Sequence, residues 1–72
     1  MTPDDLRTLG EAMYGPRWQS QVARDVGVQF RTVARWAVGD TKISPEKAGL
    51  LRSIARDRIR ALSSALSGAR HS

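Results

Sequence analysis

The stretch Trp18–Trp36, WQSQVARDVGVQFRTVARW, decides which fold we expect for the whole chain. Its apolar residues recur at helical spacing in two groups, the first comprising Val22, Ala23 and Val26 and the second Val33 and Trp36. Between the groups stands Gly27, where a helix would end in a left-handed residue, which glycine adopts without steric cost. The stretch therefore predicts two short amphipathic helices joined by a tight turn.

The second of these helices carries arginine on the face that points away from its apolar pair. With Val33 and Trp36 pointing inward and about 100° per residue, Arg31 points almost directly away. Ala34 and Arg35 lie on the outer flanks of the same helix. The DNA major groove admits one α-helix, and the planar guanidinium of arginine matches guanine edges and phosphates. The pattern favours a helix that reads DNA.

The stretch resembles the helix-turn-helix of the Cro/repressor-like (XRE-type) family. That family combines a glutamine at a polar helix start, an alanine, a glycine four residues later, a valine, and a valine with an aromatic residue in the second helix. The matching residues in this chain are Gln19, Ala23, Gly27, Val28, Val33 and Trp36. In one departure, the cap of the second helix is Gln29 where the family usually has serine, threonine or aspartate. Glutamine is a poorer N-cap, so the resemblance defines the reading positions to within about one residue.

The resemblance and the outward pattern together predict a DNA-contacting set. Candidates for base readout are Gln29, Phe30, Arg31, Ala34 and Arg35. Candidates for phosphate contacts are Arg17, Gln19, Thr32 and Lys42. Among these, Arg31 is the residue that we expect to donate two hydrogen bonds to guanine O6 and N7. Phe30 lies on the border of the inward face, so a core position is the alternative for it.

Composition narrows the class of protein. The chain has 72 residues, which suffices for one domain, and it lacks cysteine, which excludes a disulfide framework and a thiolate metal site. Residues 1–14 carry a net charge of −2 and the remainder +7, which gives the total of +5. A basic balance beside such a helix pair favours nucleic acid. With neither a long apolar run nor a signal peptide at the N-terminus, we expect a soluble, cytoplasmic protein without a membrane partner.

The flanking residues predict two further helices. Thr2 and Pro3 form a capped helix start, and an apolar face follows at Leu6, Leu9 and Met13. A second cap and proline at Ser44 and Pro45 open a helix that reaches about residue 67, roughly 33 Å at 1.5 Å per residue. We therefore expect an all-α, compact helix-turn-helix bundle of about four helices with a long C-terminal helix. Residues 1–67 form the single domain, and residues 68–72 form a disordered tail.

The last helix, residues 45–67, is longer than a small helix-turn-helix core can cover. Its distal apolar row therefore needs a partner, and a second copy of the chain is the simplest one; the row consists of Ile59, Leu62 and Leu66. The alternative is that this end frays, because Ser63, Ser64 and Ser67 are weak helix formers.

The function expected from the sequence is that of a sequence-specific, double-stranded DNA-binding regulator. The resemblance implies a dimeric repressor of the kind found in phages and mobile elements, including repressors encoded beside anti-CRISPR genes. It would occlude a promoter, often its own, at a palindromic operator. The alternatives are a protein-interaction module that reuses the fold and a nonspecific, architectural DNA binder. No catalytic constellation is visible in the sequence, so we expect no enzyme, cofactor, metal or small-molecule ligand.

Overall fold

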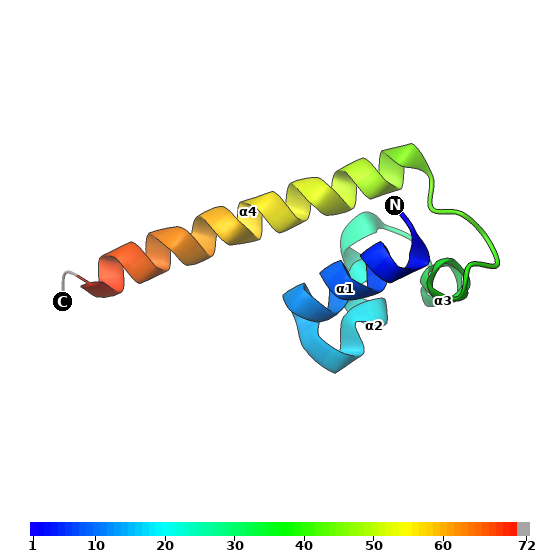
Figure 1. Cartoon of the computed structure of the whole chain (residues 1–72), viewed down its shortest axis with the longest axis horizontal. Coiled ribbons are helices and arrows are strands. Elements are labelled where there is room, and N and C mark those ends of the chain that lie inside the picture. The colour runs from blue at the N-terminus through cyan, green and yellow to red at the C-terminus, as the bar shows by residue number, and fades with distance from the viewer. Residues whose placement is uncertain (71–72) are drawn as a thin grey trace.

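The computed structural model describes the backbone of residues 1–70 and the side chains of residues 1–68. Within this part, the chain forms α1 (Pro3–Tyr14), the short 3-10 turn η1 (Gly15–Arg17), α2 (Trp18–Val26), α3 (Phe30–Val38) and α4 (Pro45–Arg70). Figure 1 shows α1, α2 and α3 gathered beneath one half of α4, while the other half of α4 extends beyond them. The expected all-α bundle with a long C-terminal helix is confirmed.

The predicted helix start at the N-terminus is built as a reciprocal cap. The Thr2 hydroxyl accepts a hydrogen bond from the Asp5 backbone N–H at 3.1 Å, and the Asp5 carboxylate accepts one from the Thr2 backbone N–H at 3.1 Å. The bond from the Thr2 backbone, followed by the bond with its side chain, lowers the pKa of Asp5 below its usual value.

The turn between α2 and α3 has the expected left-handed glycine. Gly27 lies at φ 74° and ψ 38°, and the Val28 backbone N–H donates to the Ala23 carbonyl at 2.9 Å. Gln29 is the N-cap of α3 in extended geometry, without a hydrogen bond from its side chain. Helix α3 thus begins at Phe30, and the poor cap has not moved its start.

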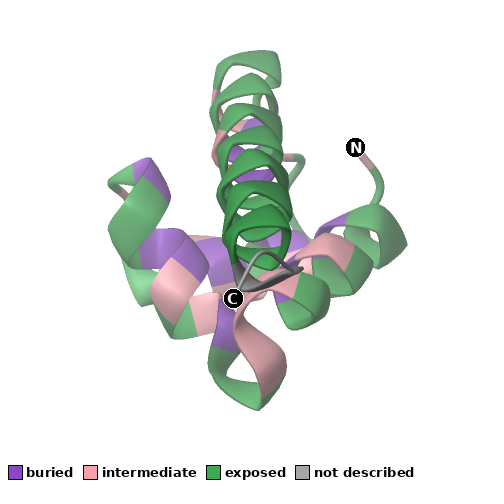
Figure 2. Ribbon diagram, turned by 90° about the vertical axis from the view of Figure 1, so that its left-hand side faces the viewer, coloured by how far each residue is buried: buried purple, intermediate pink, exposed green. Residues whose placement is uncertain are grey.

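The core gathers the apolar faces of all four helices. Figure 2 shows the buried residues concentrated where the helices meet, in contrast to the exposed C-terminal half of α4. The central cluster consists of Leu6, Trp18, Val22, Ala23, Val26, Val33, Trp36 and Leu51. Gly10 of α1 is buried against the Trp18 ring, and a Cβ there would come within 2.8 Å of Trp18 Cδ2. The absence of a side chain at Gly10 lets α1 and α2 approach closely.

The C-terminal end of α4 differs from the expectation. Helix α4 continues to Arg70, beyond its expected end near residue 67, and residues 71–72 of the predicted disordered tail lie outside the described residues. A glycine inside a helix costs only about 1 kcal/mol relative to alanine, and no proline follows to stop the helix. Among residues 1–70, no helix combines the length and the apolar composition that crossing a bilayer requires.

Candidate nucleic-acid interface

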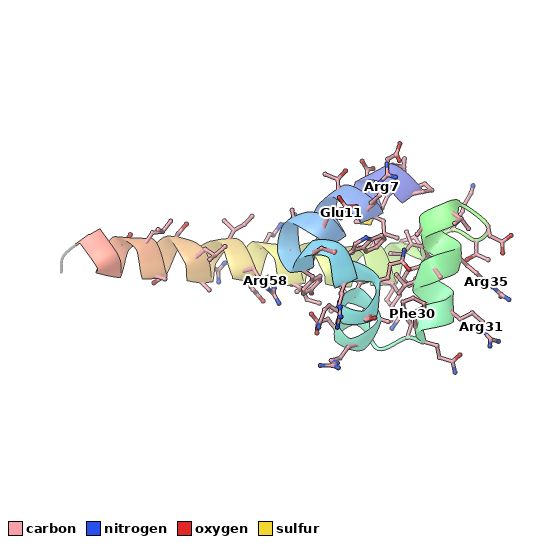
Figure 3. The ribbon with its side chains drawn as sticks, turned by 90° about the horizontal axis from the view of Figure 1, so that it is seen from below. Arg7, Glu11, Phe30, Arg31, Arg35 and Arg58 are labelled. Carbon is pink, nitrogen blue, oxygen red and sulfur yellow. The ribbon has the colours of Figure 1, made fainter. Side chains whose placement is uncertain are left out.

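Helix α3 turns an arginine-bearing face away from the rest of the molecule. Val33 and Trp36 are buried and hold the inner side of the helix in the core. Arg31 and Arg35 are exposed, and Figure 3 shows both side chains directed outward, at the end of the molecule opposite the tip of α4. The two arginines are one turn apart on the same helix, so they form a cationic edge that solvent and a polyanion can reach.

The other predicted base-reading residues surround these arginines. Gln29 is exposed at the start of α3, and Ala34 is half-buried. The Phe30 side chain is 55% exposed, which overturns the alternative that it is a core residue. An exposed aromatic ring at the first turn of α3 is available for an apolar contact with a ligand.

A shallow hollow brings part of the predicted set together at the N-terminal ends of α2 and α3. It has a volume of about 510 Å³ and is lined by Pro16, Arg17, Gln19, Ser20 and Phe30. Two predicted phosphate contacts, Arg17 and Gln19, thus share one hollow with the predicted base contact Phe30. Ser20 was not expected from the sequence; its exposure on α2 beside Gln19 places its hydroxyl there.

The two remaining phosphate candidates lie elsewhere. Thr32 is half-buried on the flank of α3. Lys42 is exposed in the loop that follows α3, where it lines a separate small pocket with Trp36 and Ile43. The predicted cations therefore flank α3 at both of its ends: Arg17 near its start and Lys42 beyond its finish.

The electrostatic surroundings of the two α3 arginines differ. Arg35 Nε lies 4.0 Å from an Asp40 carboxylate oxygen, and both side chains are largely exposed. Exposed pairs of this kind contribute about 0–1 kcal/mol, so Arg35 can exchange this partner for another anion. Arg31 has no acidic partner within 4.0 Å in the described part of the chain. Its full charge is available to a ligand.

One exposed apolar residue on this face had no assigned role. The Val38 side chain is 79% exposed at the last turn of α3. The angular rule that directs Arg31 outward also directs Val38 outward, so the sequence contained the signal for it.

Three contacts that join α1, α2 and α4 were not foreseen. The Lys47 ammonium donates to the Val26 carbonyl at 2.9 Å and thereby caps the end of α2 from α4. The Tyr14 hydroxyl donates to the Asp25 carboxylate, and Arg58 stacks 4.5 Å above the Tyr14 ring. Burial, followed by the hydrogen bond with Asp25, raises the pKa of Tyr14 to about 12. These contacts depend on tertiary placement, for which local spacing carries no signal.

The predicted dimer residues lie far from α3, on the free half of α4. Ile59 and Leu62 are each 64% exposed and Leu66 is 65% exposed. Ile59 and Leu62 also line an apolar groove shared with α1, and Leu66 lies farther along the helix.

No protein-family model matches this chain, and neither a curated protein nor a solved structure matches it. The residues and their geometry therefore carry the functional argument.

Proposed function

We propose that this protein is a sequence-specific, double-stranded DNA-binding transcriptional regulator that acts as a homodimeric repressor. The observation that carries the proposal is the outward face of α3, where Arg31 and Arg35 are exposed on a helix whose opposite side is anchored in the core. A helix with this division fits the major groove, because its outward, arginine-bearing side is free. The resemblance of residues 18–36 to the Cro/repressor-like helix-turn-helix supports the same reading.

In the proposed complex, α3 lies in the major groove and its exposed residues divide the contacts by chemistry. Arg31 donates two hydrogen bonds to guanine O6 and N7, and Arg35 leaves Asp40 for a base or a phosphate. The apolar side chains of Phe30 and Ala34 contact thymine methyl groups, and the Gln29 amide reaches a base edge at the helix start.

Phosphate contacts at both ends of α3 would fix its orientation on the duplex. Arg17 and Gln19 in the shared hollow hold one stretch of backbone, and Lys42 holds another. The Thr32 hydroxyl on the helix flank contacts the phosphate beside the groove. Such contacts position the protein without reading sequence.

Repression follows from occlusion. A small domain that covers a promoter excludes polymerase without any effector domain, and the promoter of its own gene is the natural target. A two-fold dimer binds an inverted repeat with half-site centres about 34–36 Å apart. We place this activity in the cytoplasm of a bacterial or phage-infected cell, and we propose a binding protein, not an enzyme.

The test is a selection of bound DNA from a random duplex library at about 150 mM salt, a concentration at which phosphate contacts alone are weakened. We expect an inverted repeat with the half-site spacing given above. Salt-dependent retention without an enriched sequence would identify an architectural DNA binder instead. If no duplex is retained, the protein-interaction reading replaces this proposal.

A further inference from the structure

An apolar groove runs between α1 and the middle of α4. Its volume is about 360 Å³, and its lining consists of Leu9, Ala12, Met13, Ala55, Arg58, Ile59, Ala61 and Leu62. Arg58 is the one charged residue of the lining. Its guanidinium is engaged by the Met13 carbonyl at 3.4 Å and by the Tyr14 ring. The walls of the groove are therefore mostly apolar, and the guanidinium of Arg58 already has partners within its own chain.

The apolar face of α4 that lines the groove continues along the free half of the helix. Ala48, Leu51 and Ala55 are buried against the body, whereas Ile59 and Leu62 on the same helical face are exposed. At about 100° per residue, the four positions from Ala55 onward lie within roughly 60° of one another; they are Ala55, Ile59, Leu62 and Leu66. This stripe, Ala55 to Leu66, has the form of a buried helix face that lacks its covering helix.

The charge pattern along α4 distinguishes the orientations in which a second copy could cover the stripe. Residues 52–60, RSIARDRIR, carry four arginines and one aspartate, a net charge of +3. Residues 61–69, ALSSALSGA, carry no charge and are mostly small. A second copy of α4 in antiparallel orientation would place the uncharged segment opposite the cationic one. A parallel copy would place arginine against arginine, which is unfavourable at close range.

We propose that the groove receives the distal half of α4 from a second copy of this chain, antiparallel to the first, so that α1 is part of the dimer interface. In this register, Ile59 faces the second copy's Leu62, and Ala55 faces the second copy's Leu66. Residues 52–60 then face residues 61–69 of the second copy throughout, and the small side chains of that segment seat against Leu9, Ala12 and Met13. Each copy supplies both a groove and its occupant, as a two-fold interface requires.

The inference rests on the homodimer of the proposed function, and its test uses no DNA, so either can fail without the other. Sedimentation equilibrium of the full chain is expected to give twice the chain mass of 7.9 kDa. Leu62→Glu and Ala12→Glu each place a carboxylate in the interface twice, and we expect the dimer dissociation constant to rise on the order of 100-fold or more. Both residues are exposed in the single chain, so the fold tolerates the changes.

Ser64→Glu is the matched control, since it adds the same charge at an exposed position on the opposite side of α4. It is expected to remain dimeric. A monomeric wild-type chain at several hundred micromolar would overturn the proposal, and a dimer that survives Ala12→Glu would remove α1 from the interface.

Disulfide cross-linking tests the orientation, because the natural chain has no cysteine. A mixture of an Ile59→Cys chain and a Leu62→Cys chain is expected to form a mixed disulfide-linked dimer under mild oxidation, faster than either chain alone. Cross-linking of Leu62→Cys with itself at the higher rate would overturn the antiparallel arrangement.

Discussion

Helix α3 and the distal half of α4 both turn a whole face to solvent, but the two faces differ in kind. On α3, the outward residues include two exposed arginines, and the apolar residues Val33 and Trp36 are held inside. On distal α4, the exposed stripe is apolar and continues the side that is buried nearer the body. Figures 1 and 3 place the two faces at opposite ends of the long axis.

The comparison shows that an exposed amphipathic helix can bind a partner through either its polar side or its apolar side. A helix whose apolar side is satisfied offers its polar side to a ligand, as we propose for α3 and DNA. A helix whose apolar side is unsatisfied lowers its free energy by covering that side, as we propose for α4 and a second copy. Because the two faces lie far apart, a substitution in one face makes no direct contact with the other.

The largest effect is expected at Leu51, where α4 enters the hydrophobic core. Leu51 is fully buried in the core, so Leu51→Ala should lower the free energy of unfolding by about 2–5 kcal/mol. Leu50, its exposed neighbour, is the matched control, and Leu50→Ala should cost about 1 kcal/mol or less. Urea denaturation measures both, and equal costs would show that α4 is not anchored through Leu51.

The α3 face is broken selectively by Arg31→Ala. We expect the free energy of DNA binding to weaken by about 1–3 kcal/mol, with specificity relaxed at one base pair. The mass of the protein in sedimentation equilibrium should stay unchanged. The control is Arg56→Ala, which removes the same charge from an exposed position of α4. Binding titrations against single-base operator variants measure the effect. A uniform loss on every sequence would contradict base readout by Arg31.

Two glycines in different surroundings test the packing between the helices. A Cβ at Gly10 would meet the Trp18 ring, so Gly10→Ala should destabilise the fold by about 1–3 kcal/mol through overpacking. At Gly49, nothing lies within 4 Å of the added Cβ, so Gly49→Ala should stabilise by about 0.5–1 kcal/mol. Thermal melts of the two variants should shift in opposite directions. An unchanged or higher melting temperature for Gly10→Ala would contradict the close α1–α2 contact.

The smallest effect concerns Tyr14, which links α1 to α2 and α4. The folded state holds its phenol proton up to a pKa of about 12, whereas the usual pKa of a tyrosine is 10.0. The contribution of Tyr14 to the free energy of unfolding is therefore fully present below pH 10 and is lost as the pH rises from about 10 through 12. Tyr14→Phe should remove this part of the alkaline loss, measured as the difference between the two pH profiles of unfolding. Identical profiles would show that Tyr14 is not coupled to folding.

Local spacing predicted the fold and the placement of the cationic edge, because both depend on helical periodicity. The outward direction of Arg31 follows from the inward direction of Val33 and Trp36, and the structure places both as expected. The groove could not be predicted in this way, because it exists only where α1 and α4 come together. The contact of Gly10 with Trp18 and that of Lys47 with the Val26 carbonyl have the same origin.

The most direct test of DNA recognition by α3 is a binding titration at about 150 mM salt. It compares the DNA upstream of the protein's own gene with scrambled DNA of equal length, for the wild-type chain and for Arg31→Ala. We predict a preference of about 10³ or more for the upstream DNA, reduced in the variant. Equal affinity of the wild-type chain for both DNAs, or no binding to either, would contradict the account.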